Sequence, residues 1–204
     1  MEQSKAILMT ILRNKQTPID QFRDSAHQLA LIMAQETTTY LPTKSQTITT
    51  PLEAPFNGTT WAQPVTLIPI LRSGLALLPA FLQYFPNANV GVVGLKRDEA
   101  TAIAHWYYKN IPPIPSQSMV IILDPMLATG GSALATLDML TSLNIKQKQI
   151  IFAGIISSQE GINAVKKAYP DITVIIADCD PALNQAKYIV PGLGDFGDRF
   201  FGTE

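Results

Sequence analysis

The chain has 204 residues, of which 47% are hydrophobic and 15% are charged, and these values favour one globular domain with a full core. The formal net charge of −1 offers no basic excess for nucleic acid or a membrane surface. The single cysteine excludes an intramolecular disulfide and a cysteine metal cluster. Because the first residues lack a signal-peptide pattern and no run of about 18 apolar residues occurs, we expect a cytoplasmic protein.

Residues 17–36 are predicted to form a helix. Thr17 suits the N-cap, Pro18 suits the first helical position, and Asp20 follows three residues after the cap. Apolar residues then recur on one face of this helix: Phe22, Ala26, Leu29 and Met33.

Residues 47–63 are predicted to form an extended arm that folds back on itself. The stretch from residue 38 to 61 is rich in Thr and Pro without a helical period, and Asn57-Gly58 is a strong hairpin-turn signal. An arm of this kind either reaches a partner subunit or remains a surface hairpin, and the sequence favours neither.

From residue 65 onward, apolar runs alternate with helical patterns. Strands are expected at 65–71, 89–95, 119–123, 149–157 and 172–177, and helices at 74–84, 132–143 and 159–168. Such alternation predicts an α/β fold with a mainly parallel five-stranded sheet flanked by helices. Ligands bind such sheets at the carboxyl ends of the strands. Four residues follow or end predicted strands and are therefore expected on one rim: Arg72, Arg97, Asp124 and Ser157.

The segment 124–132 has the composition of an anion-binding loop between a buried strand and a helix. It consists of Asp124, Pro125, Met126, Leu127, Ala128, Thr129, Gly130, Gly131 and Ser132. The helix N-terminus, the hydroxyl groups and the glycines, which allow close approach to the backbone, together favour a phosphate ligand. A Walker loop is excluded because Gly131 stands where that loop needs lysine. The acid at the start of the loop indicates sugar hydroxyls beside the phosphate.

Two arginines are expected beside this loop. Arg72 follows the first strand and Arg97 follows the second, so the pair is predicted to clamp a polyphosphate. Residues 96–118 are expected to be irregular and to form a lid. Within that stretch, His105 has no neighbour that would orient it for acid–base catalysis.

The C-terminal stretch contains Gly192, Gly194 and Gly197, which formally match the dinucleotide fingerprint. We reject that match, because the chain after it is too short for the helix and second strand that the fingerprint requires. The stretch is expected instead to be a loop wrapped around a small flat ligand. The single domain would thus comprise an N-terminal helix and arm (1–63), a core (64–178) and a ligand-binding tail (179–204).

Four separated segments resemble uracil phosphoribosyltransferase, a family of type I phosphoribosyltransferases. They are IPILRSGLAL (68–77), VVGLKRDEAT (92–101), LDPMLATGGSALATLDML (123–140) and YIVPGLGDFGDRFFGT (188–203). The resemblance implies transfer of a 5-phosphoribosyl group from 5-phosphoribosyl 1-diphosphate (PRPP) to uracil, giving UMP and diphosphate. It also implies a magnesium ion carried by PRPP, and a homodimer or higher homo-oligomer without nucleic-acid or membrane partners.

The same resemblance implies roles for individual residues. Arg72 and Arg97 would meet the diphosphate, and the loop from Asp124 to Ser132 would hold the ribose and the 5-phosphate. Uracil would be read by the backbone of the tail, and Asp195 would also face PRPP. The catalytic residues would be Arg72, Arg97, Asp124 and Asp195, and the uracil-binding residues Ile189, Gly194, Asp195 and Phe196. A cis peptide bond between Leu71 and Arg72 is also expected from the resemblance.

Two alternatives remain open at this point. A purine or orotate phosphoribosyltransferase would use the same phosphate loop. A transcription regulator that senses PRPP or UMP and binds RNA would share the fold, although the near-neutral charge argues against it.

Overall fold

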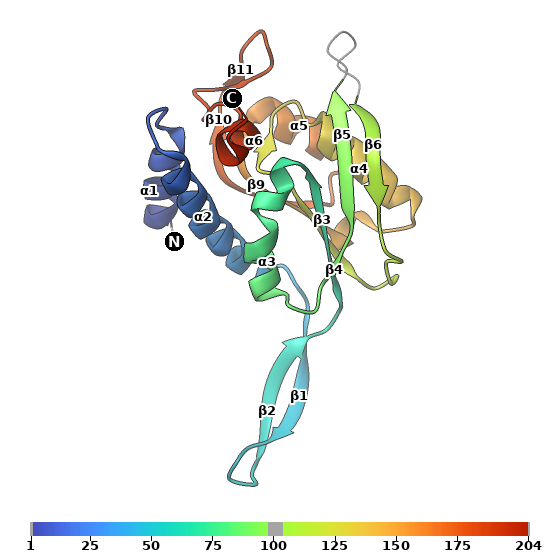
Figure 1. Cartoon of the computed structure of the whole chain (residues 1–204). Coiled ribbons are helices and arrows are strands. Elements are labelled where there is room, and N and C mark those ends of the chain that lie inside the picture. The colour runs from blue at the N-terminus through green and yellow to red at the C-terminus, as the bar shows by residue number, and fades with distance from the viewer. Residues whose placement is uncertain (1, 98–103, 204) are drawn as a thin grey trace.

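The computed structural model describes residues 2–97 and 104–203. A mainly parallel sheet with the strand order β10-β9-β7-β3-β5-β6 lies at its centre (Figure 1). Its strands are β3 (Val65–Leu71), β5 (Val92–Arg97), β6 (Ala104–Asn110), β7 (Met119–Leu123), β9 (Ile150–Ser158) and β10 (Thr173–Asp180). The short strands β4 (Asn89–Val90) and β8 (Met126–Leu127) pair with β3 and β9. The predicted fold class is confirmed, and β6 extends the parallel sheet as an antiparallel edge strand.

Helices cover both faces of the sheet, and each face has its own apolar core. One core joins the sheet to α1 (Glu2–Arg13), α2 (Ile19–Thr38), α3 (Leu78–Tyr84) and α6 (Phe196–Phe201). The other joins it to α4 (Gly131–Ser142) and α5 (Gln159–Ala168). Neighbouring strand residues alternate between the two cores, as Ile121 and Ile122 do. This two-sided burial explains why the strands read as continuous apolar runs.

The remaining elements are short or lie outside the central sheet. They are the hairpin strands β1 (Thr43–Thr49) and β2 (Pro55–Trp61), the 3₁₀ helices η1 (Ser73–Ala76) and η2 (Gln147–Gln149), and the ribbon of β11 (Ala182–Leu183) with β12 (Ile189–Val190). Across the described residues, no helix is long and apolar enough to cross a membrane.

The arm projects from the body of the molecule (Figure 1), but its turn is not where the sequence indicated. Asn57 and Gly58 lie inside β2, opposite Thr47 and Gln46. The chain reverses instead between β1 and β2, where Glu53 takes a φ of 55° and the Thr50 N–H donates to the Ala54 carbonyl at 2.9 Å. The Asn57 side chain accepts a hydrogen bond from Thr47 Oγ1 across the pair, which gives this turn-forming residue a place in a strand.

The predicted start of the N-terminal helix is also wrong in detail. The N-cap of α2 is Pro18, without a side-chain hydrogen bond. Thr17 Oγ1 donates instead to the Ile11 carbonyl at 2.6 Å, because α1 packs beside α2 and offers that acceptor. Helix α1 was not predicted from the sequence.

Two segments expected to be irregular contain regular structure. Part of the expected lid is strand β6, whose main-chain groups pair with β5, so residues 104–110 are regular where irregular structure was expected. Residues 98–103 lie outside the described part of the chain. The tail ends in the short helix α6, with Asp195 as its N-cap, so it is not a loop throughout.

Candidate functional site

The candidate site lies where the order of the parallel strands reverses. The chain passes from β3 to its neighbour β5, and then crosses back to β7 on the other side of β3. The loops after β3 and β7 therefore leave the sheet in opposite directions, and such switch points open a ligand crevice in doubly wound folds. Arg72 follows β3, Asp124 follows β7 and Arg97 ends β5. Ser157 is fully buried within β9.

The loop of residues 124–132 has the geometry of an anion cradle. Gly130 takes a φ of 85° as the N-cap of α4, a backbone conformation that side chains other than glycine adopt with strain. The first amides of α4 have no partner inside their own helix and point back toward the loop. The loop and the first turn of α4 line a concavity of about 70 Å³. Its size and donors suit a phosphate group.

The neighbouring helix α5 holds this loop in place. Ser158 Oγ donates to the Ala128 carbonyl at 2.6 Å and accepts from the Gly161 N–H at 2.9 Å. A Cβ atom on Gly161 would lie 2.4 Å from the Ala128 carbonyl oxygen, so only glycine permits this approach. Neither residue was predicted from the sequence. A serine directly before a predicted helix was the available signal, since serine is a preferred N-cap.

Asp124 is the residue of the loop with the most perturbed ionisation. Burial raises the pKa of its carboxyl group, and the negative charge of Asp195 acts in the same direction. A hydrogen bond of 3.3 Å from the Met126 N–H to Asp124 Oδ1 opposes both effects. The balance places the pKa of Asp124 at about 7. Two carboxyl groups far apart in sequence therefore share one region of the site.

Arg72 reaches toward the C-terminal tail in this structure. Its Nη2 atom lies 3.5 Å from Asp198 Oδ1 and 3.3 Å from Thr203 Oγ1, and its guanidinium lies 5.4 Å from the centre of the Phe201 ring. The side chain is 54% exposed, so it is accessible to a ligand in the crevice. The Leu71–Arg72 peptide bond is cis, as the resemblance implied. Arg97 pairs with Ala104 through the backbone.

The tail approaches the phosphate loop from the opposite side of the crevice. Asp195 Oδ1 accepts a hydrogen bond of 3.0 Å from the Asp198 N–H, and the Phe196 N–H donates to Met126 Sδ at 3.4 Å. Gly194 is exposed with a φ of 83°, whereas Ile189 is buried in β12. The backbone of the tail thus borders the loop that begins at Asp124.

The side chain of Phe196 has a structural position. It is fully buried, and its ring packs 5.3 Å from that of Phe22 on α2 and 5.7 Å from that of Phe200. Phe196 as a whole has no exposed surface in this structure, and its N–H is bonded to Met126 Sδ.

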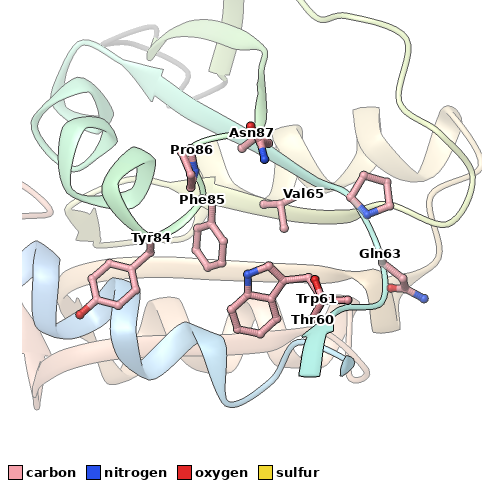
Figure 2. Close-up of a pocket in the computed structure, with 10 residues that line it drawn as sticks. Thr60, Trp61, Gln63, Val65, Tyr84, Phe85, Pro86 and Asn87 are labelled. Carbon is pink, nitrogen blue, oxygen red and sulfur yellow. The ribbon is translucent and has the colours of Figure 1, made fainter. Parts of the chain in front are cut away.

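A separate cavity of about 260 Å³ lies at the base of the arm (Figure 2). Trp61, Tyr84 and Phe85 contribute its aromatic walls, and the Trp61 and Phe85 rings are 6.1 Å apart. Val65, the first residue of β3, lines the cavity, whereas Arg72 follows the last. Seven residues of extended strand span roughly 23 Å, so this cavity is remote from the candidate site.

Comparisons with known proteins agree with this geometry. The family model described as uracil phosphoribosyltransferase matches residues 2–203. A uracil phosphoribosyltransferase from Metamycoplasma hominis is 41% identical over 199 residues, covering 96% of this chain and 93% of that protein. Another, from Fervidobacterium nodosum, is 40% identical over 196 residues and covers 96% and 94%.

Solved structures with the same fold are also found. The AQ2163 protein from Aquifex aeolicus has a TM-score of 0.90 and 29% identity, covering 98% of this chain and 95% of that one. A mutant hypoxanthine phosphoribosyltransferase from Trypanosoma cruzi, complexed with the product IMP, has a TM-score of 0.50 and 11% identity over 79% of this chain and 75% of its own, a likeness of fold alone. On the family model and the two relatives, the chain belongs to the uracil phosphoribosyltransferase family.

Proposed function

We propose that the protein transfers the 5-phosphoribosyl group from PRPP to uracil, giving UMP and diphosphate. The observation that carries this proposal is the meeting of two segments at the switch point. Met126 of the phosphate loop accepts a hydrogen bond from Phe196 of the tail, and Asp124 interacts electrostatically with Asp195. A phosphate held in the loop and a flat base held by the tail would be close enough to share one ribose.

The loop residues would hold the 5-phosphate and the ribose of PRPP. The amides at the start of α4 suit the phosphate, with hydroxyl groups from Thr129 and Ser132 beside them. Asp124 would accept hydrogen bonds from the ribose hydroxyls. Its partly buried position strengthens such bonds, since water competes less for the carboxylate.

Arg72 and Arg97 would stabilise the diphosphate as it leaves. The transition state has a ribosyl group with cationic character, while negative charge grows on the departing oxygen. Arg72 would turn from Asp198 and Thr203 toward the diphosphate, because a doubly charged phosphate is a stronger partner than a carboxylate 3.5 Å away.

Magnesium would enter with the diphosphate of PRPP. Within the described residues, no group of three or more His, Cys, Asp or Glu side chains could hold a metal ion. The carboxylates of Asp124 and Asp195 nevertheless suit Mg²⁺, which usually takes one or two carboxylates along with substrate phosphate oxygens. When bound, the ion would neutralise charge on the leaving diphosphate.

The base would be read mainly by main-chain atoms of the tail. Uracil presents two carbonyl acceptors flanking one N–H donor, which the backbone around Ile189 and residues 194–196 would match. Asp195 would orient the base or receive its N1 proton as the new bond to C1 of the ribose forms. Cytosine would place donor against donor, which leaves buried groups unpaired at about 1–3 kcal/mol each.

We further propose that the enzyme acts as a cytoplasmic homodimer or higher homo-oligomer. The projecting arm supports this, because Ile48, Leu52 and Phe56 expose 47%, 89% and 56% of their surfaces. Apolar side chains gathered on a projecting element are typical of interfaces. Sedimentation velocity of the protein and of a Leu52→Ser, Phe56→Ser variant would test it, and a monomeric parent protein would refute it.

The activity is tested by incubating the purified protein with PRPP, Mg²⁺ and a panel of free bases. Chromatography should detect UMP from uracil, and omission of Mg²⁺ should suppress it. Absence of UMP at substrate excess would refute the proposal. Turnover of hypoxanthine, guanine or orotate in place of uracil would identify the enzyme as a different phosphoribosyltransferase.

A further inference from the structure

The tail that borders the site is attached to the other end of the chain by a partly buried ion pair. Arg13, the last residue of α1, donates from Nη1 to Asp180 Oδ2 at 2.9 Å and from Nη2 to Asp180 Oδ1 at 2.7 Å. Asp180 ends β10 and is only 4% exposed. Asp178 adds a contact of 2.8 Å to Arg13 Nη2. Figure 1 shows α1 beside the strands at this end of the sheet.

Both members of this pair also bind the backbone of Gly192. The Gly192 N–H donates to Asp180 Oδ2 at 2.7 Å, and the Gly192 carbonyl accepts from Arg13 Nη1 at 2.9 Å. Gly192 has a φ of 67°, and a Cβ atom there would lie 2.1 Å from the Ile189 carbonyl oxygen. The ion pair thus fixes the two peptide groups that flank Gly192. Only glycine is accommodated at this position of the turn.

A second arginine ties the same turn to the same part of the N-terminus. Arg199 of α6 donates to the carbonyl groups of Leu193 and Leu12 and, at 2.7 Å, to that of Asn14. Two sets of hydrogen bonds therefore join residues 12–14, at the end of α1, to the tail. The Arg13 side chain donates to the turn, and the carbonyl groups of Leu12 and Asn14 accept from Arg199. The turn at residues 192–193 is held from both sides, directly before Gly194 and Asp195.

We propose that Arg13 and Asp180 are positioning residues for the base, acting through Gly192 to set the main-chain atoms that read uracil. This inference rests on the proposed function of the tail. Neither residue is placed against substrate by its contacts. Both act on the backbone of Gly192, which lies between Ile189 and residues 194–196, the groups that would meet the base. Hydrogen bonding to Asp180, above other effects, also raises the pKa of Arg13, so the guanidinium stays charged at neutral pH.

The consequence follows from how main-chain recognition works. A side chain that reads a base can change rotamer, but a main-chain donor moves only with the loop that carries it. A displacement of about 1 Å in a recognition element can cost roughly 100-fold in rate. The phosphate loop is held separately, through the bonds of Ser158 to Ala128 and Gly161. Displacement of the turn at Gly192 should therefore affect uracil more than PRPP.

The decisive variant is Asp180→Asn, which keeps the shape of the side chain. An amide NH₂ group would face either the Gly192 N–H or the Arg13 guanidinium, so at least one donor would lose its acceptor. The Michaelis constant for uracil should rise about 10- to 100-fold, while that for PRPP changes less than about threefold. Preference for uracil over cytosine should also decrease.

The matched control is Glu36→Gln. Lys5 Nζ lies 2.7 Å from Glu36 Oε2, an ion pair that joins α1 to α2 without contacting the tail. This control loosens α1 in the same way, yet it should leave the ratio of the two Michaelis constants at the parent value. If Asp180→Asn does not fold, Arg13→Lys retains the charge but loses the forked contact, and it should raise the uracil constant selectively.

Hydrogen–deuterium exchange of residues 188–195 provides a readout that does not depend on activity. Exchange should accelerate in Asp180→Asn and not in Glu36→Gln. Equal rises in both Michaelis constants, equal effects of the two variants, or unchanged exchange would overturn the inference. If the parent protein makes no UMP, the proposed function fails on its own, and the exchange result alone then decides whether the ion pair holds the turn.

Discussion

Replacing Asp124 with asparagine should stabilise the ligand-free protein above neutral pH while impairing catalysis. The carboxyl group has an ordinary pKa of 3.8, and burial followed by the nearby charge of Asp195 raises it to about 7 in the folded protein. Between these values the folded protein retains a proton that the unfolded chain releases. Stability from this group is therefore fully present below pH 3.8 and is lost as the pH rises toward 7.

The magnitude follows from the two pKa values. At about 1.4 kcal/mol per pKa unit, the shift corresponds to roughly 4 kcal/mol of free energy of unfolding at pH 8. Part of that loss has already occurred at pH 5. The contribution of Asp124 to the free energy of unfolding should therefore be about 2–3 kcal/mol smaller at pH 8 than at pH 5. Asparagine does not titrate and still accepts the Met126 N–H, so its variant should escape this loss.

The assay is urea-induced unfolding of both proteins at pH 5 and pH 8 without ligands. The stability difference in favour of Asp124→Asn should be about 2–3 kcal/mol larger at pH 8. The exposed Asp171→Asn serves as the control and should show no such pH-dependent gain. In parallel, the specificity constant of Asp124→Asn for PRPP should fall roughly 100- to 1,000-fold. If its stability difference is the same at both pH values, the reasoning about burial and charge is wrong.

Three further predictions concern the other groups of the site. Arg97→Ala should lower the specificity constant for PRPP, by an amount that corresponds to about 2–4 kcal/mol of lost transition-state stabilisation, without lowering the melting temperature. An unchanged specificity constant would show that Arg97 does not contact PRPP. Gly194→Val should damage uracil use, because a β-branched residue is strained at a φ of 83°; comparable kinetics of variant and parent would show that this loop does not read the base. Phe196→Leu should cost about 1–2 kcal/mol of unfolding free energy, measured by urea denaturation, because its ring is fully buried. Its preference for uracil over cytosine should be retained, and a lost preference would contradict the structural position of the ring.

Local patterns in the sequence were sufficient wherever an element depends on its own residues. The strands at 65–71 and 119–123 and the helix at 159–168 occur with the predicted bounds. Buried parallel strands need an uninterrupted apolar run, and such a run can be recognised in the sequence without knowledge of the neighbouring strands. The loop after Asp124 could be predicted for the same reason, because its glycines, its hydroxyl side chains and the helix that follows are contiguous in the sequence.

Elements whose conformation depends on a distant partner could not be predicted in this way. Thr17 would cap a helix on local grounds, but its hydroxyl donates a hydrogen bond to the Ile11 carbonyl instead. Asn57 would form a turn, but the register of β1 and β2 places it in a strand. In each case the local preference amounts to about 1 kcal/mol, which one tertiary hydrogen bond can outweigh.

The site itself shows the same division. The sequence by itself determined which residue types are present: an acid and a glycine-rich loop after one strand, and a glycine-rich tail at the end of the chain. Only the tertiary structure brought Asp124 beside Asp195 and joined Arg13 to Asp180 across the molecule. A carboxyl pKa and a partly buried ion pair depend on distances between groups and on exclusion of water, and the order of residues along a chain specifies neither.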